Sequence, residues 1–369
     1  MRDARPDPSP WSEAGGGWRS ADASPRARGL RMPAEWCPHE ATWLSWPTNE
    51  VTWPGRRLEA VREAYVEMIR WLALGEEVRI LVDDQDTAEN LHLRLEGELG
   101  PSADNVTCWI IPTVDAWIRD YGPNFLKDAA NERVRVPAAN RWRFNAWGGK
   151  YPELAVDDGV CPRILERLNA VVFEPGIVLE GGSIDVNGQG LCLTTRQCLL
   201  HPNRNPELSL LQIEMYLTEF LGAKRILWLE EGIIGDDTDG HVDDIARFVA
   251  VDHVLVADEP DPADGNHSIL QDALRRLETW QEEGLFRVTR LPMPEPVLAE
   301  GHRLPASYAN FYIANRVVLV PVFGCSRDRE ALSLLQSVFP GRQVVGIPAR
   351  DMVYGLGAVH CLTQQQPVS

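Results

Sequence analysis

The sequence predicts an α/β fold made of repeated strand–strand–helix–strand units in one globular domain. Short apolar runs with the composition of strands alternate with longer segments of helical periodicity. Several strand-like runs come in adjacent pairs, which favours such units over one doubly wound parallel sheet. No segment rich in Pro, Gly and Ser divides the chain after residue 31, so we expect one domain over residues 31–369 behind a disordered tail over residues 1–30.

Apolar runs rich in β-branched, aromatic or Leu residues, punctuated by Pro, Asp or Gly, predict the strands. They cover residues 41–47, 78–84, 106–112, 191–195, 225–231, 247–258 and 312–322. The last two runs are long enough to hold a pair of strands each.

Apolar residues at intervals of three and four predict the helices. These helices cover residues 57–74, 207–222, 268–284 and 329–338. Gly75, Gly222 and Gly284 follow or close the first three, and glycine is favoured there because it readily adopts the left-handed conformation that ends a helix.

The chain carries 36 Lys and Arg residues against 54 Asp and Glu residues, a net charge of −18. Such a surface repels nucleic acid and anionic membranes and attracts small cations, although plain solubility is the simpler explanation of the charge alone. No run approaches the roughly 20 apolar residues of a membrane span. The seven cysteines form no CxxC pair, and the N-terminal segment lacks the apolar core of a secretory signal. We therefore expect a cytoplasmic protein with mostly buried, reduced thiols.

The densest polar segment is residues 236–244, in which five Asp residues surround His241. His241 and Asp243 are two positions apart, so on an extended segment both side chains face the same way. A neighbouring carboxylate raises the pKa of an imidazole and orients the ring for acid–base catalysis. A solvated acidic loop and a divalent metal site are the two alternative interpretations.

Two further acids follow apolar runs and stand beside glycine. Asp120 precedes Gly122-Pro123, which predicts a carboxylate at the end of a strand, with Trp117 three residues earlier. Glu180 stands before Gly-Gly, where the backbone allows a ligand to approach closely. Taken alone, a surface Arg–Asp pair beside a core Trp and an exposed hairpin turn explain these two segments equally simply.

Near the C-terminus a Gly-rich turn leads into a compact, strand-like Val-His-Cys-Leu segment that contains Cys361. A free cysteine is most often a buried filler. His360 would face the opposite side of a strand from Cys361, so it is not the obvious base for that thiol.

Taken together and in order, these segments resemble the agmatine deiminase family of the guanidine-modifying (pentein) superfamily. The segments that carry the resemblance are residues 32–55 (MPAEWCPHEATWLSWPTNEVTWPG), 144–152 (FNAWGGKYP), 179–188 (LEGGSIDVNG), 238–248 (TDGHVDDIARF) and 360–367 (HCLTQQQP). The resemblance implies a pentein α/β propeller, in which five ββαβ-like modules with pseudo-fivefold symmetry surround a central active-site channel.

The resemblance also assigns roles to individual residues. It makes Cys361 the nucleophile, His241 the acid–base group, Asp120 and Asp243 the carboxylates that hold the guanidinium, Glu180 a further acid near His241 and the guanidinium, and Trp117 and Asp237 further contacts to the substrate. A guanidinium offers its N–H donors in a planar fork that carboxylates match, and a thiolate is nucleophilic enough to attack its central carbon.

The implied reaction is hydrolysis of agmatine to N-carbamoylputrescine and ammonia, a step of putrescine and polyamine biosynthesis, without a metal or an organic cofactor. The family resemblance also suggests a homo-oligomer. Alternatives are another guanidine substrate (peptidyl-arginine, free or methylated arginine), an amidinotransferase, a metal-dependent hydrolase that uses the Asp-rich segment, and a non-catalytic binding module. The sequence departs from the commonest residues of the family motifs at four positions, which are Tyr121, Lys150, Leu356 and Ala358.

Overall fold

The computed structural model describes residues 24–128 and 136–368, which form a mixed α/β structure, as the sequence predicts. One of its repeating units is built around β9 (Leu191–Thr195), which pairs antiparallel with β8 (Ile184–Val186). After α7 (Leu210–Leu221) the chain returns as β10 (Arg225–Leu229), which pairs parallel with β9. This order of strand, strand, helix and strand is the unit that the paired apolar runs indicate.

Three more sheets in the described part of the chain repeat this order of one antiparallel and one parallel pairing. They are β5 (Asn124–Asp128), β6 (Ala138–Asn140), α5 (Val160–Arg167) and β7 (Val171–Phe173); β11 (Ala246–Ala250), β12 (His253–Asp258), α8 (Asn266–Glu282) and β13 (Arg287–Pro292); and β16 (Tyr312–Ile313), β17 (Val317–Val322), α9 (Asp328–Val338) and β18 (Gln343–Pro348).

A further sheet joins the two ends of the described chain. The C-terminal β19 (Gln364–Pro367) pairs antiparallel with β2 (His39–Ser45). Parallel strands then follow, and they are β3 (Glu77–Val82) after α1 (Arg56–Leu72) and β4 (Val106–Ile110) after α2 (Gln85–Leu99). The pairing of β19 with β2 holds the segment around Cys361 inside the molecule rather than at a fraying terminus.

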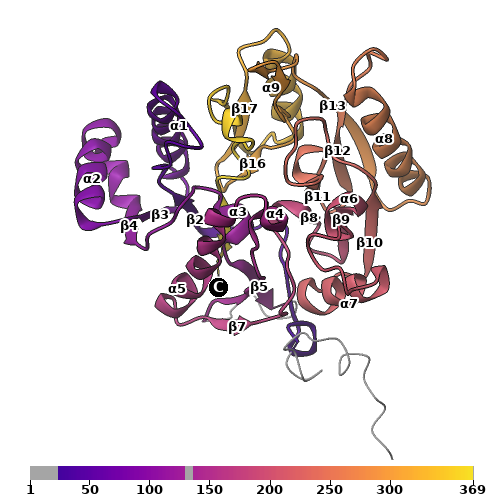
Figure 1. The fold of residues 1–369 in the computed structure, drawn as a ribbon, viewed down its shortest axis with the longest axis horizontal. Coiled ribbons are helices and arrows are strands. Elements are labelled where there is room, and N and C mark those ends of the chain that lie inside the picture. Colours follow the sequence, from indigo (N-terminus) through magenta and orange to yellow (C-terminus); the bar gives the residue numbers. More distant parts are fainter. Residues whose placement is uncertain (1–23, 129–135, 369) are drawn as a thin grey trace, which may run out of the picture.

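The smaller elements complete the fold. They are β1 (Leu30–Arg31), which pairs with β5, the two-stranded ribbon of β14 (Leu298–Ala299) and β15 (His302–Arg303), and the short helices α3 (Ile118–Tyr121), α4 (Ala146–Gly149) and α6 (Arg196–Leu199). Figure 1 shows the long helices around the outside of the view, with the first strands of the sheets and the short α3 and α4 towards the middle. No helix of the described residues is long and apolar enough to cross a membrane.

Local sequence explains where the predicted helices begin and end. α7 starts at a capping box in which Ser209 and Gln212 satisfy each other's backbone N–H groups, and it ends at Gly222 with a φ of 72°. The four predicted helices are confirmed as α1, α7, α8 and α9. The sequence interpretation missed α2, because only Leu91 and Leu95 on this 15-residue helix are buried and its apolar stripe is correspondingly narrow.

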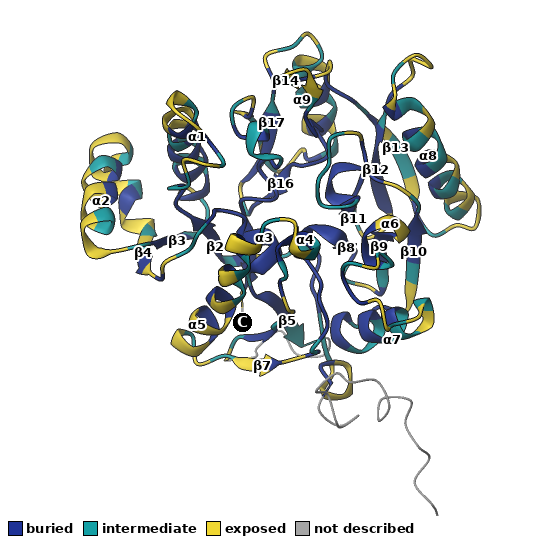
Figure 2. Cartoon of the chain, in the orientation of Figure 1, coloured by how far each residue is buried: buried dark blue, intermediate teal, exposed yellow. Residues whose placement is uncertain are grey.

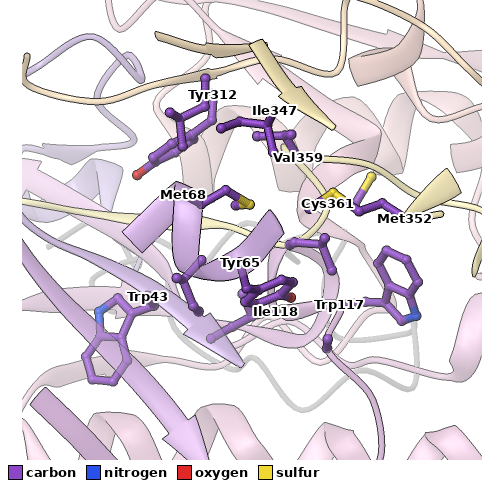
Figure 3. Close-up of a cluster of buried hydrophobic side chains, with 14 of the residues drawn as sticks. Trp43, Tyr65, Met68, Trp117, Ile118, Tyr312, Ile347, Met352, Val359 and Cys361 are labelled. Atoms are coloured by element: carbon purple, nitrogen blue, oxygen red, sulfur yellow. The ribbon is translucent and has the colours of Figure 1, made fainter. Parts of the chain in front are cut away.

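The core lies between the sheets and the inner faces of the helices. Figure 2 shows buried strands at the centre and exposed residues on the outer faces of helices such as α2 and α5. Trp43 of β2 and Tyr65 and Met68 of α1 are fully buried in the largest apolar cluster. The same cluster contains Trp117 and Cys361, so the core directly supports two of the predicted site residues (Figure 3).

The predicted N-terminal tail falls into two parts. Residues 1–23 lie outside the described residues. Residues 24–30 instead form ordered structure, because a short 3-10 helix at Arg26–Arg28 lies against α7 and Arg26 pairs with Glu219 at 3.2 Å. The ordered domain therefore begins somewhat before residue 31.

Candidate active site

The predicted catalytic residues share one position in the repeating unit, just before the first strand of a sheet. Asp120 lies in α3 before β5, and Glu180 precedes the 3-10 turn Gly181–Ser183 before β8. His241 precedes the 3-10 turn Val242–Asp244 before β11, and Cys361 lies in the turn before β19. Because these segments come from different sheets, residues far apart in the sequence meet at one site.

The predicted extended conformations of these segments are wrong. Asp120 lies on a short helix, His241 caps a 3-10 turn, and residues 359–362 form a turn rather than a strand. Strand alternation would have sent adjacent side chains to opposite faces. In the turn, His360 and Cys361 instead both approach Asp243, at 2.7 Å from Nδ1 and 3.8 Å from Sγ to the Oδ2 atom.

Gly182 forms the floor on which three site side chains converge. A Cβ atom added there would lie 2.5 Å from Nδ1 of His241 and 3.1 Å from carboxylate oxygens of Asp120 and of Asp243. Its backbone N–H also donates to Oδ1 of Asp120 at 3.0 Å. The Gly-Gly pair therefore permits a close approach, as its sequence indicates, and any side chain at this position would push the catalytic groups apart.

Asp120 is held by three neighbours. Besides Gly182, the indole Nε1 of Trp147 donates to Oδ2 at 2.9 Å, and Nδ1 of His241 lies 3.8 Å from Oδ1. Trp147 belongs to the FNAWGGKYP segment and has a φ of 52°, in the left-handed region. The unusual backbone of this segment thus presents an indole N–H to the site.

Asp243 is fully buried and is anchored by a chain of side chains behind the site. His360 connects Oδ2 of Asp243, at 2.7 Å from its Nδ1, to Glu35, at 2.8 Å from its Nε2. Glu35 in turn accepts a hydrogen bond from Arg247 at 2.9 Å. Although burial alone would raise the pKa of Asp243, the His360 ring holds that pKa below its ordinary value. Oδ1 of Asp243 has no hydrogen-bond partner among the described residues, which leaves it available to a ligand.

Cys361 lies at the inner wall of a cavity of about 350 Å³. Burial, together with Asp243 and Asp244, raises the pKa of its thiol well above the ordinary value. Without a cationic ligand, Cys361 is therefore a neutral thiol at neutral pH.

The cavity is walled by aromatic and acidic side chains. Its lining includes Asn49, Thr52, Asp115, Trp117, Asp120, Trp147, Tyr151, Glu153, Asp237, Thr238, Tyr354, Leu356 and Cys361. Of the predicted site residues, Cys361, Asp120, Trp117 and Asp237 line it directly. No Lys or Arg residue lines this cavity in the part of the chain that the structure describes, so it favours cations.

Of the other predicted site residues, His241, Asp243 and Glu180 lie outside the lining, in the wall of the site. Burial alone would lower the pKa of His241, but the carboxylates of Asp120, Asp243 and Glu180 outweigh it, and the pKa is raised above its ordinary value. Glu180 is fully buried and accepts a hydrogen bond from Nε of Arg204 at 2.6 Å. Donor atoms of Glu180, His241 and Cys198 lie within 4.8 Å of one another, close enough to share a cation.

The Asp-rich segment folds over the cavity. Lys150 donates to Asp239 at 2.8 Å and lies 3.5 Å from Asp237, while the hydroxyl group of Tyr151 donates to Asp237. Lys150, which departs from the commonest family residue, therefore affects the site: its ammonium group partly compensates the negative charge of Asp237 at the cavity.

The sequence interpretation missed the parts played by Trp147, His360, Glu35 and Arg204. Glu35 and His360 both lie inside the segments that carry the family resemblance, and their place in those motifs was the one available signal. Their contact spans 325 positions, and a single sequence cannot reveal such a pairing.

A sequence profile of the Porphyromonas-type peptidyl-arginine deiminase family matches residues 31–367. This chain belongs to that family. Within the peptidyl-arginine deiminase family it is 38% identical to the agmatine deiminase of Ectopseudomonas mendocina, over 93% of this chain and 97% of that protein.

Solved structures agree with this membership in the peptidyl-arginine deiminase family. An Enterococcus faecalis agmatine deiminase superposes with a TM-score of 0.83 and 33% identity over 95% of this chain and 99% of that one. A cysteine-to-serine variant of the C. jejuni agmatine deiminase with substrate bound gives a TM-score of 0.79 and 30% identity, over 91% and 96% of the two chains.

The raised pKa of Cys361 predicts that its thiol is alkylated slowly in this protein when no substrate is bound. We expect the rate of iodoacetamide modification of Cys361, followed by mass spectrometry of its peptide, to rise with a midpoint above the ordinary thiol pKa of about 8.5. A bound guanidinium analogue too small to block the sulfur, such as guanidinium itself, should lower that midpoint. A midpoint at or below pH 7 without ligand would contradict this electrostatic account.

Proposed function

We propose that this chain is an agmatine deiminase, which hydrolyses agmatine to N-carbamoylputrescine and ammonia in the route to putrescine. One observation carries the proposal: the thiol of Cys361 faces an acidic, aromatic-walled cavity next to the carboxylates of Asp120 and Asp243. The kinship with agmatine deiminases supports the choice of substrate.

The guanidinium group binds between Asp120 and Asp243. Both are buried carboxylates at the inner end of the site, and Oδ1 of Asp243 has no hydrogen-bond partner among the described residues. Carboxylates on two sides of the planar fork place the central carbon over the sulfur. The bound cation also offsets the field of the carboxylates, so substrate binding favours the thiolate of Cys361.

The reaction proceeds in two halves at the central carbon. The thiolate of Cys361 adds to this carbon, and the tetrahedral adduct expels ammonia after His241 transfers a proton to the leaving nitrogen. This leaves an amidino-thioether, in which sulfur has replaced the departed amino group. His241, now neutral, takes a proton from water, which adds to the same carbon and displaces the thiolate to release the ureido product.

Glu180 acts through His241 in this scheme. Its carboxylate lies close to the His241 ring and contributes to the raised pKa of His241. Its salt bridge to Arg204 fixes the carboxylate in place. We therefore assign Glu180 to orienting and charging the imidazole, with the direct grip on the guanidinium left to Asp120 and Asp243.

The cavity lining favours agmatine over arginine. Agmatine carries a second positive charge and no carboxylate, and Asp237 and Glu153 are available in the lining to its distal amine. Free arginine would also require a cationic group to meet its carboxylate, and the lining holds neither Lys nor Arg within the described residues.

A panel of guanidines tests the proposal directly. Agmatine, free arginine, methylated arginine and a peptidyl-arginine substrate are compared for ammonia release and for the ureido product, with Cys361→Ala as the control. We expect agmatine to give the highest kcat/KM and N-carbamoylputrescine as product. Preferential turnover of arginine or peptidyl-arginine would reject the proposed substrate, and transfer of the amidine to an added amine would indicate an amidinotransferase.

Replacing Asp120 with asparagine should weaken binding of agmatine. Because a hydrogen bond to a charged group contributes about 1.5–3 kcal/mol, we expect KM to rise about 10- to 100-fold. The amide keeps the size of the side chain but loses one of the two acceptors that Trp147 and Gly182 use, so the melting temperature should fall moderately. Steady-state kinetics checks this, and an unchanged KM in a folded variant would remove Asp120 from the binding site.

A metal-dependent hydrolase is the second candidate function, because Glu180, Cys198 and His241 supply three ligand types that bind divalent ions. These ligands include none of the aspartates of the Asp-rich segment. We expect ammonia release from agmatine to survive treatment with EDTA. Loss of activity with EDTA that a divalent ion restores would favour this second candidate.

We propose that the five sheets with a shared strand order are the five modules of a pentein propeller, with the cavity at its centre. The common position of the site residues, each before the first strand of a module, supports this. The family resemblance suggests that the chain forms a homo-oligomer, and we propose that it does. We also propose that the protein is cytoplasmic, because all seven cysteines are free thiols. Light scattering of the purified chain tests the oligomer.

A further inference from the structure

One sheet delivers to the site a residue that the sequence did not single out. Asp120, Glu180, His241 and Cys361 each precede the first strand of a sheet, and Asn310 holds the same position before β16. Asn310 is fully buried, and its side-chain Nδ2 lies 3.2 Å from Sγ of Cys361. An amide group therefore contacts the atom that carries the proposed chemistry.

The orientation of this amide is decided by its neighbours. The backbone N–H of His360 donates to Oδ1 of Asn310 at 2.9 Å, and this oxygen lies farther from Sγ of Cys361, at 3.6 Å, than Nδ2 does. The NH₂ group then faces Oδ1 of Asp244 at 3.0 Å and Sγ of Cys361 at 3.2 Å. The N–H of His360 also reaches the backbone oxygen of Asn310 at 3.1 Å, so the side chain of Asp244 decides the orientation. A flipped amide would set its oxygen against Oδ1 of Asp244, two acceptors in place of a donor and an acceptor. One N–H of Asn310 is thus aimed at the sulfur.

The sulfur needs such a donor because its surroundings oppose a negative charge. Burial and the carboxylates of Asp243, Asp244 and Asp120 all raise the pKa of Cys361. A hydrogen bond donated to an ionised acceptor is about twice as strong as one between neutral groups. The contact from Asn310 therefore stabilises the thiolate more than the thiol and lowers the thiol pKa.

We propose that Asn310 is a further catalytic residue, whose amide N–H holds the sulfur of Cys361 in place and stabilises its thiolate. The assignment deepens the proposed deiminase function and rests on it for its role in turnover. The hydrogen bond from the Asn310 amide to the buried sulfur does not depend on which substrate the protein hydrolyses. Asp244 and the His360 backbone are the positioning groups that keep this donor aimed.

The titration of Cys361 in Asn310→Ala tests the proposal. Iodoacetamide modification of the Cys361 peptide is followed by mass spectrometry across pH in the full chain without substrate. We expect the midpoint to move up by about 1–2 pH units, because a hydrogen bond to a charged group is worth about that much. The midpoint is the readout, since a thiolate of higher pKa is intrinsically more nucleophilic and partly masks a change in rate.

Asn140→Ala is the matched control. Asn140 is also a fully buried amide, and it donates to Phe220 at 2.7 Å and to Asn124 at 3.0 Å, away from the site. Its loss should lower the melting temperature without moving the Cys361 midpoint. Asn310→Asp is the second variant, because it keeps the shape of the side chain if the alanine variant fails to fold. A carboxyl group at this position lies against Asp244, so the two share a proton and none is donated to the sulfur; this variant should therefore also raise the midpoint.

The outcomes separate this inference from the proposed function. An unchanged Cys361 midpoint in folded Asn310→Ala or Asn310→Asp would overturn the assignment, even if the wild type hydrolyses agmatine. A raised midpoint in these variants, with the control unchanged, supports the donor even if agmatine is not the substrate. An equal rise in Asn140→Ala would also overturn it, because the shift would then follow from general loosening of the fold.

Discussion

Replacing Cys361 with serine should abolish ammonia release from agmatine. A serine hydroxyl stays protonated at neutral pH, and an imidazolium at His241 cannot take its proton, so no competent nucleophile forms. Removing the nucleophile of a hydrolase costs on the order of 10⁶ in kcat. We therefore expect kcat to fall by at least about 10⁴-fold, measured by coupled ammonia detection.

Cys192→Ser is the matched control for this prediction. Cys192 is a fully buried thiol in β9, outside the cavity lining, so its replacement tests for a general effect of losing a cysteine. Agmatine should still bind to the Cys361→Ser variant, since the carboxylates remain. Retention of even a tenth of the wild-type kcat in that variant would exclude Cys361 as the nucleophile.

Replacing His241 with glutamine should lower kcat by about 10²- to 10⁴-fold, the range of a lost general acid–base group. His241 serves both halves of the reaction, so the effect should fall on kcat more than on KM. The raised pKa of His241 keeps the ring protonated to a higher pH than an ordinary histidine. The proton donor for departing ammonia is therefore present below that pKa and lost as pH rises through it.

The buried His253 provides the control for His241. Its ring bonds Oγ1 of Thr289 at 3.0 Å in another part of the fold, and burial lowers the pKa of His253 to about 4, so it is neutral at neutral pH. We expect His253→Gln to leave the kcat for agmatine within a few-fold of the wild type. Equal losses of kcat in the two variants would indicate that replacing a buried histidine damages the fold, and would contradict a specific catalytic role of His241.

Much of the fold was predictable because several strands are buried on both faces. β9 and β10 are short, continuous apolar segments that stand out in the sequence, and α1, α7, α8 and α9 have clear apolar faces. The strands β6 and β7 contain three residues each, which is too short to show any periodicity. Their existence depends on pairing with neighbouring segments, and this pairing is a tertiary property.

The chemistry of the site was predictable from residue types, and its geometry was not. Motifs drew attention to Cys361, His241, Asp120 and Glu180, because isolated reactive residues beside glycines are informative. The turn that carries Cys361 was predicted as a strand, and Asp120 was placed at the end of one, since apolar flanks dominate the local pattern. The contact of Asn310 with Cys361 spans 51 positions, and no local pattern reveals it.

The mass of the enzyme during turnover tests the central claim most directly. The wild-type enzyme is mixed with agmatine, quenched with acid at short times and digested, and the peptide that carries Cys361 is weighed. Covalent catalysis predicts a transient increase equal to agmatine less ammonia, located on Cys361 and absent from Cys361→Ala. Ammonia release by the wild type, with this peptide unmodified throughout the time course, would contradict the covalent mechanism.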